Sequence, residues 1–447
     1  MKEEKIMAAA IGFLMIIVIV ALLLKGKMSP IVVLAIVPTI SALILGFVPT
    51  DILGFVPTDI LGFIADGIKT TTSNGILFIF SVIYFGVLSD TGLFDVIVNW
   101  LVKKAGNNVI AVTVVTAMIA TIAHLDGTTA VTVLITIPAM YPVYKRMNID
   151  ARILLCITGA CMGVMNLLPW GGPTARAATV LQMDATELWH MLIPLQIVGL
   201  VMNSVIAVLL GMYAVKKGAG AGKGVEVETN EKEKAETEAL KKSRGYLIFN
   251  FLLTVAVIAA LSTGVGKSYV IFMLGLCVLL AVNYPDQKIQ DKLVKKHAPA
   301  ALIISATLFA AGAMVGIFDG TGMLEAMANA IMAVIPAAMG KYIHIIFGIL
   351  ALPFGLCVGT DAYFYGIMPL VMQVGETYGV ASLNTALTML IGKNLALMVS
   401  PLVPATYLAI GLTGTELKDH MKFSIPPYYV VSLIMLVLGV ILGIISL

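Results

Sequence analysis

The chain has 447 residues, of which 60% are hydrophobic and only 12% are charged, and its mean hydropathy is +1.01. Soluble domains are about half apolar and about a quarter charged, so this composition excludes a soluble protein and requires lipid as the solvent for most of the surface. The net charge of +3 gives no indication of nucleic-acid binding.

Apolar segments of the kind that cross a membrane recur along the first half of the chain. The first is followed directly by Lys25 and carries no small-residue cleavage site, so we interpret it as a membrane span and not as a signal peptide. Residues 1–215 are therefore predicted to form an N-terminal transmembrane repeat. Its apolar segments lie at residues 7–24, 30–47, 75–88, 154–181 with a break, and 191–215.

A perfect tandem copy lies between the second and third of these segments, since residues 45–52 (LGFVPTDI) recur at residues 53–60. We interpret it as a slipped duplication that lengthens an outer loop, because added loop length costs little entropy. No role for the duplication follows from the sequence.

A hydrophilic segment divides the chain at residues 216–245. It is rich in Lys, Glu and Gly and has no apolar period, which is typical of a solvated linker. Residues 246–447 are then predicted to form a C-terminal transmembrane repeat. Its apolar segments lie at residues 246–262, 268–282, 298–318, 383–412 with a break, and 423–447.

Two further apolar regions, residues 108–145 and 342–375, each carry a short polar tip in the middle. The first tip is His124-Leu-Asp-Gly-Thr-Thr129 and the second is Gly359-Thr-Asp361. Each region is either a pair of full spans joined by a tight turn or a re-entrant hairpin that enters the membrane halfway. We predict re-entrant hairpins, an assignment that depends on the polar tips.

Motifs of the first half recur in the same order about 230 residues later, as expected for an internal repeat. PWGGPT at residues 169–174 matches PLVPAT at 401–406, and TELWH at 186–190 matches TELKDH at 415–420. With re-entrant hairpins, each half crosses the membrane about five times, so the second half must be inverted relative to the first. The sequence therefore predicts an all-α integral membrane protein built from two inverted repeats, the plan of secondary transporters.

Basic residues test this topology, because they concentrate in cytoplasmic loops. Pairs such as Lys103/Lys104 and Lys145/Arg146 and the basic residues of the linker all fall on one side of the predicted topology. We therefore predict a multi-pass protein of the cell membrane with a cytoplasmic linker and both termini outside.

The first break, residues 166–176 (NLLPWGGPTAR), is a candidate anion site. Pro169 removes a hydrogen-bond donor, and Gly171 and Gly172 free the backbone, so a half-helix can restart with its N–H groups directed at the break. Arg176 adds a positive charge one turn further on, and such a place binds anions. The alternative is a kink from which Arg176 snorkels outward, but an Arg this far from a span end is costly unless it has a task.

The second break, residues 400–406 (SPLVPAT), has hydroxyl groups but no Arg, so the first break is expected to hold more of the substrate charge. Both breaks and both tips contribute candidate substrate-binding residues: Asn166, Gly171, Gly172, Thr174, Arg176, Thr128, Thr360, Asn394, Ser400 and Thr406.

The tips also supply candidates for binding the coupling ion. The carboxylates of Asp126 and Asp361 are placed to bind a proton or a cation near the midplane, and His124 to relay a proton. The alternatives are that each Asp caps its own turn and that His124 is a packing residue.

Enzyme signatures are absent from the sequence. It contains no HExxH, P-loop or GxSxG motif and no Cys/His pair at ligand spacing, so we predict neither a cofactor nor a dedicated metal site. The linker is too short for a nucleotide-binding domain, which excludes an ATP-driven pump. An intramembrane enzyme that uses Asp126 and Asp361 is the alternative outside the transporter class.

Several of these segments resemble the citrate–metal–proton symporter (CitMHS) family of the ion-transporter superfamily. They are Leu125-Asp-Gly127, residues 166–178 (NLLPWGGPTARAA), Tyr84-Phe-Gly86 and Gly92-Leu-Phe-Asp95, and the resemblance extends over nearly the whole chain. It implies proton-driven uptake of citrate in complex with a divalent cation such as Mg²⁺ or Ca²⁺. It also implies a homodimer in which a transport part slides against a scaffold part. Thr128 stands where related proteins often carry a second acidic residue. If that acidic residue helps to bind the cation, its absence here changes the expected coupling ion or metal preference.

Charge favours a metal complex as the cargo. Citrate carries about three negative charges at neutral pH and about one after chelating a divalent cation, and a bare trianion is much harder to desolvate. One Arg and two helix dipoles can hold the complex. We therefore predict a proton-coupled symporter of citrate, whose metal arrives bound to the substrate. The alternatives are a transporter of another small anion, such as a di- or monocarboxylate or arsenite, and a cation/proton antiporter on the same scaffold.

Overall fold

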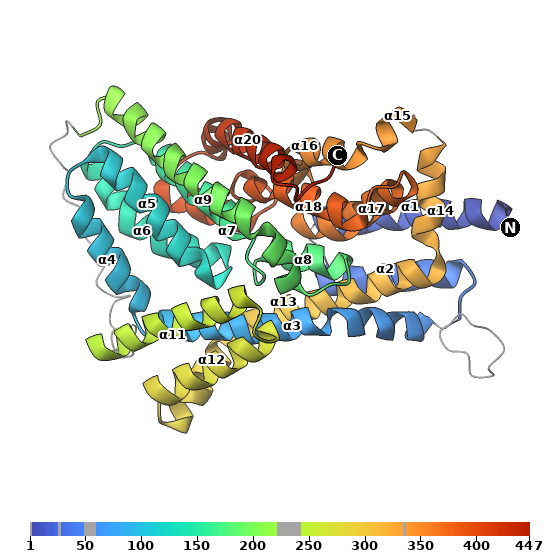
Figure 1. Cartoon of the computed structure of the whole chain (residues 1–447), viewed down its shortest axis with the longest axis horizontal. Coiled ribbons are helices and arrows are strands. Elements are labelled where there is room, and N and C mark those ends of the chain that lie inside the picture. The colour runs from blue at the N-terminus through green and yellow to red at the C-terminus, as the bar shows by residue number, and fades with distance from the viewer. Residues whose placement is uncertain (1, 26–27, 49–59, 221–242, 334–336) are drawn as a thin grey trace.

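The computed structural model of the protein describes residues 2–25, 28–48, 60–220, 243–333 and 337–447 (Figure 1). These residues form helices and no strands. Eight of the described helices are long and apolar enough to cross a membrane, which confirms the predicted all-α membrane class. Most of the tandem copy at residues 45–60, and residues 221–242 of the linker, lie outside the described residues.

The first half contains a pair of helices, one long helix, a hairpin, a broken helix and a second long helix. The elements in chain order are α1 (Lys2–Lys25), α2 (Pro30–Ile44), α3 (Ile60–Asp90), α4 (Leu93–Ala105), α5 (Val109–Ala123), the 3₁₀ turn η1 (His124–Asp126), α6 (Thr129–Arg146), α7 (Ala151–Met165), α8 (Gly172–Val180) and α9 (Ala185–Lys216).

The second half repeats this order of elements. They are α11 (Arg244–Thr263), α12 (Ser268–Asn283), α13 (Gln287–Thr321), α14 (Met323–Met332), the short α15 (Ala337–Gly340), α16 (Ile343–Cys357), the π-helical η2 (Ala362–Ile367), α17 (Met368–Thr377), α18 (Ser382–Lys393), the 3₁₀ segment η3 (Asn394–Val399), α19 (Pro404–Thr413) and α20 (Leu417–Ile441). The boundaries of the two repeats at residues 215 and 246 stay a prediction, as does the depth to which the hairpin arms enter the membrane.

The long helices α3 and α13 pack against each other along their length and run in opposite directions (Figure 1). Ser305 of α13 donates a hydrogen bond of 2.8 Å to the Gly75 carbonyl of α3. Toward the end of α3, Asp90 pairs with Lys296 at 2.6 Å, so residue numbers fall along α13 as they rise along α3. Because the two helices hold the same place in their halves, this antiparallel contact is what an inverted repeat requires.

Glycines allow this close approach of α3 and α13. A Cβ atom on Gly316 would lie 2.0 Å from the Phe63 carbonyl oxygen, and one on Gly67 would lie 2.0 Å from the Gly312 oxygen. Small residues at such crossings let helix backbones touch, which is a main source of packing energy inside membranes.

The Gly316→Ala variant should therefore be less stable than the wild type, although alanine normally favours a helix over glycine. The added methyl group forces the backbones of α3 and α13 apart, at a cost of at least about 2 kcal/mol. Thermal unfolding in detergent measures the effect. Gly411→Ala is the matched control, since Gly411 lies in α19 with no neighbour within 4 Å of an added Cβ. A Gly316→Ala protein that melts at the temperature of the control variant would contradict this account.

Candidate functional site

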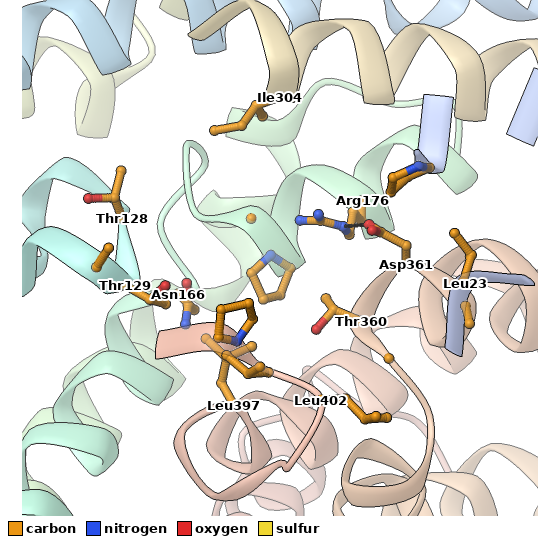
Figure 2. A pocket seen from close by; sticks show the side chains of 18 of the residues that line it. Leu23, Thr128, Thr129, Asn166, Arg176, Ile304, Thr360, Asp361, Leu397 and Leu402 are labelled. Atoms are coloured by element: carbon orange, nitrogen blue, oxygen red, sulfur yellow. Dashed lines mark hydrogen bonds and ion pairs between the residues drawn. The ribbon is translucent and has the colours of Figure 1, made fainter. Parts of the chain in front are cut away.

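A cavity of about 810 Å³ lies where both hairpin tips and both helix breaks converge (Figure 2). Thr128 and Thr129 form one side of it, and Arg176, Thr360 and Asp361 lie across from them. Its volume is within the roughly 300–1,000 Å³ of small-molecule sites. The remaining lining residues are Leu23, Met28, Ser29, Pro30, Phe78, Gly127, Ala130, Asn166, Gly172, Pro173, Ile304, Gly359, Ala362, Leu397, Leu402, Val403 and Pro404.

At the first tip, the carboxylate of Asp126 is engaged in its own turn. It accepts hydrogen bonds from the Thr128 backbone N–H at 2.8 Å and from the Thr128 hydroxyl at 2.6 Å. Trp170 holds the tip by donating from Nε1 to the Leu125 carbonyl at 2.6 Å. Thr128 therefore reaches the cavity wall, whereas Asp126 is not among the lining residues.

His124 lies behind this tip and is fully buried. Its Nδ1 is 2.6 Å from the Thr132 hydroxyl, and its Nε2 is 3.3 Å from Oδ1 of Asn166. The ring does not line the cavity. It connects the tip to the first break, because Asn166 is the C-cap residue of α7.

The first break separates α7 from α8 at residues 166–171. Thr174 donates a hydrogen bond of 2.8 Å to the Asn166 carbonyl, which ties the restarting helix to the end of the previous one. A Cβ on Gly171 would lie 2.4 Å from that same carbonyl oxygen, so only glycine fits there. Gly171 and Thr174 thus shape the break, while Asn166, Gly172 and Arg176 line the cavity.

Arg176 joins the two halves of the chain. Its Nε donates to Oδ1 of Asp361 at 2.6 Å, and both side chains are 21% exposed. Figure 2 shows the guanidinium and the carboxylate directed toward each other at the cavity wall. The guanidinium lies beside the N-terminus of α8, because a Cβ on Gly172 would be 2.8 Å from it. The structure therefore places Arg176 in the cavity and not at a lipid-facing surface.

The second break contributes a mostly apolar wall from Leu397, Leu402, Val403 and Pro404. The three polar candidates on this side do not line the cavity. Thr406 donates a hydrogen bond of 3.1 Å to the Ser400 carbonyl, as Thr174 does to the Asn166 carbonyl in the first break. The hydroxyl of Ser400 is directed at the Leu356 carbonyl, 3.5 Å away. Asn394 is 2% exposed, and its amide has no hydrogen-bond partner among the described residues.

Lys393 is the charged residue near the cavity that we did not predict as part of the site. It ends α18 and is only 1% exposed. Its Nζ donates to the Thr360 hydroxyl at 2.9 Å and lies 5.0 Å from the ring centroid of Phe364. The signal in the sequence was a lysine in the middle of an apolar segment, immediately before a helix break. Ionisable residues inside membrane segments are by default candidates for function.

The arrangement suits an anion that carries carboxylates. Among the described residues, Arg176 pairs with one carboxylate, that of Asp361, so an incoming carboxylate can take its place at the guanidinium. The described residues contain no group of three or more His, Cys, Asp and Glu side chains that could hold a metal ion. An intramembrane enzyme would need Asp126 and Asp361 in one site, but only Asp361 lines the cavity.

Comparisons with known proteins were made with the full chain. A family model described as "Citrate transporter" (CitMHS) matches residues 4–392. Among curated proteins of Bacillus subtilis strain 168, a "Citrate transporter" is 35% identical over 440 residues, which cover 98% of this chain and 100% of that protein. A "Mg(2+)/citrate complex secondary transporter" is 34% identical over 440 residues, which cover 98% of this chain and 99% of that protein.

A solved structure resembles the fold. The crystal structure of the Alcanivorax borkumensis YdaH transporter, described as having an unusual topology, superposes with a TM-score of 0.57 at 14% identity. The match covers 87% of this chain and 90% of that one. At this identity the likeness bears on the fold alone.

Proposed function

Because the chain belongs to the citrate transporter (CitMHS) family, we propose that it carries citrate across the cell membrane as a complex with a divalent metal, in symport with protons. One relative is named for citrate and another for a Mg²⁺–citrate complex. By similarity to these relatives, we expect this chain to bind citrate together with a divalent metal. We expect the complex to bind in the cavity between the tips and the breaks.

The observation that carries the proposal is the position of Arg176. Its guanidinium lies on the wall of an 810 Å³ cavity, within reach of the N-terminus of α8, and Asp361 is its ion-pair partner among the described residues. A metal–citrate complex has about one negative charge, which a single guanidinium and helix N-termini can balance at low desolvation cost. Thr128, Thr360 and Asn166 also line the cavity, and we expect their polar side chains to supply further contacts.

The remaining features of the proposal follow the sequence pattern for the topology and the family resemblance for the dimer and its moving parts. The linker is cytoplasmic and both termini are outside, because the basic loops then lie on one side of the membrane. The protein works as a homodimer, and the parts that carry the tips and the breaks move against a scaffold that contains α3 and α13. Asp126, Asp361 and His124 are the first candidates for the coupling ion, with Asp361 the one at the cavity wall.

Uptake of radiolabelled citrate into proteoliposomes tests the function. We expect uptake to require Mg²⁺ or Ca²⁺, to fall at least about tenfold when EDTA removes the metal, and to rise with an inward proton gradient. Competition with di- and monocarboxylates tests the substrate class, since these acids should compete weakly. Uptake that ignores both the metal and the proton gradient would contradict the proposal. Transport of a monocarboxylate in preference to citrate would contradict the substrate.

A further inference from the structure

Lys393 is a buried amine whose partners do not balance an ammonium charge. A protonated lysine has three N–H donors and is costly to bury without an anionic partner. Among the described residues, Nζ has one hydrogen-bond acceptor, the neutral hydroxyl of Thr360 at 2.9 Å. The rings of Phe364 and Tyr363 lie 5.0 and 5.6 Å from it and add only weak cation–π attraction. These partners therefore favour the neutral amine, and the ammonium would need an anion beside it, which is what a proton carrier coupled to an anion requires.

The position of Lys393 connects it to the anion site. Thr360, which accepts its hydrogen bond, directly precedes Asp361 in the second tip. Asp361 in turn holds Arg176 at 2.6 Å, and Lys393 is close enough to interact electrostatically with both members of that pair. The carboxylate of Asp361 thus has two basic groups near it: Arg176, which it contacts, and Lys393, which bonds the neighbouring tip residue Thr360.

Other titratable groups around α18 do not compete for this role. Tyr363 and Tyr365 of η2 face the same region as phenols, and the neighbouring positions of α16 and α20, Gly355 and Ser432, do not titrate. The remaining titratable groups on elements packed against α18 are hydrogen-bonded elsewhere or exposed. Glu376 is bonded to Ser382, His344 to Ser446, His420 to Met398, Tyr428 to Cys156 and Tyr429 to Ile349. Cys357, Lys418, Asp419 and Lys422 are exposed.

We propose that Lys393 carries the coupled proton and that Asp361 passes from Arg176 to Lys393 when the anionic cargo takes the guanidinium. The inference rests on the proposed function as a proton-coupled citrate transporter. In the empty protein, Arg176 and Asp361 neutralise each other and Lys393 is an uncharged amine. In the loaded protein, the cargo pairs with Arg176, and the amine of Lys393 has bound one proton to become the ammonium that pairs with Asp361.

Charge balance then couples the two ligands. A cargo with one negative charge and one proton on Lys393 together leave the net charge of the cavity unchanged. Each ligand makes the other more favourable to bind, because the cargo frees the carboxylate that the ammonium needs. Binding of the anion alone would leave Asp361 at the cavity wall without a cation, and binding of the proton alone would leave Lys393 without an anion.

Two substitutions test the inference in proteoliposomes. Lys393→Gln removes the titratable amine at similar length, and Lys393→Arg fixes a positive charge. Proton uptake induced by Mg²⁺–citrate, accumulation driven by a pH gradient, and citrate–citrate exchange without net proton movement are measured for each. Lys422→Gln is the matched control, because Lys422 lies on α20 with an exposed side chain.

We expect both Lys393 variants to lose cargo-induced proton uptake and to lose accumulation by at least about tenfold. Exchange should continue in Lys393→Arg, whose fixed charge can pair with Asp361, and should fall in Lys393→Gln, which leaves Asp361 without a cation in the loaded state. The control should behave as the wild type does. Wild-type proton uptake per citrate in either Lys393 variant would overturn the inference and leave the proposed function standing. A wild-type protein that transports citrate without any proton uptake would overturn the proton coupling in the proposed function, and this inference with it.

Calorimetry provides a second measurement for a variant that binds cargo without transporting it. Titration of purified protein with Mg²⁺–citrate in two buffers of different ionisation enthalpy counts the protons taken up on binding. The Lys393→Arg protein should take up fewer protons than the wild type, by about one per cargo bound. An unchanged proton count would overturn the inference.

Discussion

Replacement of Arg176 by alanine should abolish citrate uptake, with a loss of at least about 100-fold, or about 3 kcal/mol. The guanidinium is the positive charge that faces the cavity from the first break, and its ion pair with Asp361 shows that a carboxylate can bind it there. Without it, the cargo would meet the unpaired carboxylate of Asp361, which repels an anion. Uptake of radiolabelled citrate in proteoliposomes measures the loss.

Two further variants make the result specific. Arg152→Ala is the matched control, since Arg152 pairs with Asp150 at the start of α7, where its side chain is 40% exposed. It should transport normally. Arg176→Lys keeps the charge but not the planar geometry that binds a carboxylate through two N–H groups, so it should retain a small part of the activity. Size-exclusion profiles show whether each variant folds. A folded Arg176→Ala protein with normal uptake would remove the proposed anion anchor.

Replacement of Asp361 by asparagine should separate binding from transport. The carboxylate competes with the cargo for Arg176, so its removal should tighten citrate binding by about tenfold. Net uptake should nevertheless fall by at least about tenfold, because no carboxylate remains to reclaim the guanidinium when the cargo leaves. Binding is measured by titration calorimetry with Mg²⁺–citrate and uptake in proteoliposomes.

Asp126→Asn is the control for this variant. Asp126 is also a tip carboxylate, but it bonds the Thr128 turn and does not line the cavity. Its substitution should change binding little. Weaker citrate binding in Asp361→Asn, or equal changes in both variants, would show that Asp361 does not compete with the cargo.

Local chemistry explains why the breaks could be predicted. Pro169, Gly171 and Gly172 interrupt a helix wherever they occur together, and the structure has α7 end and α8 begin around them. Arg176 could be predicted as a functional residue because placing a guanidinium in lipid is costly, and this cost does not depend on the detailed fold. The order of elements along the two halves was likewise readable from motifs that recur at one spacing.

The direction of polar side chains at the breaks could not be predicted. Thr174 and Thr406 are hydroxyls in corresponding segments, and each donates to a backbone carbonyl of its own break instead of facing the cavity. A carbonyl left free where a helix stops takes the nearest donor, and which donor is nearest depends on the path of the backbone. Whether these residues contact the substrate stays a prediction.

Hydrogen-bond and ion-pair partners that lie far apart in the chain could not be predicted from the sequence either. Asp126 and Asp361 both sit in polar tips, yet one bonds a residue two positions away and the other bonds Arg176, 185 positions away. Lys393 was overlooked because its partner Thr360 is 33 positions away on another element. Only the packing of the second tip against α18 brings these two groups together.

A structure determined with Mg²⁺–citrate bound tests the central claim most directly. The account predicts density for the complex in the cavity between the two tips and the two breaks, with a citrate carboxylate in hydrogen-bond contact with the Arg176 guanidinium and Asp361 turned toward Lys393. Density for the complex outside this cavity, with the ion pair of Arg176 and Asp361 intact, would contradict it.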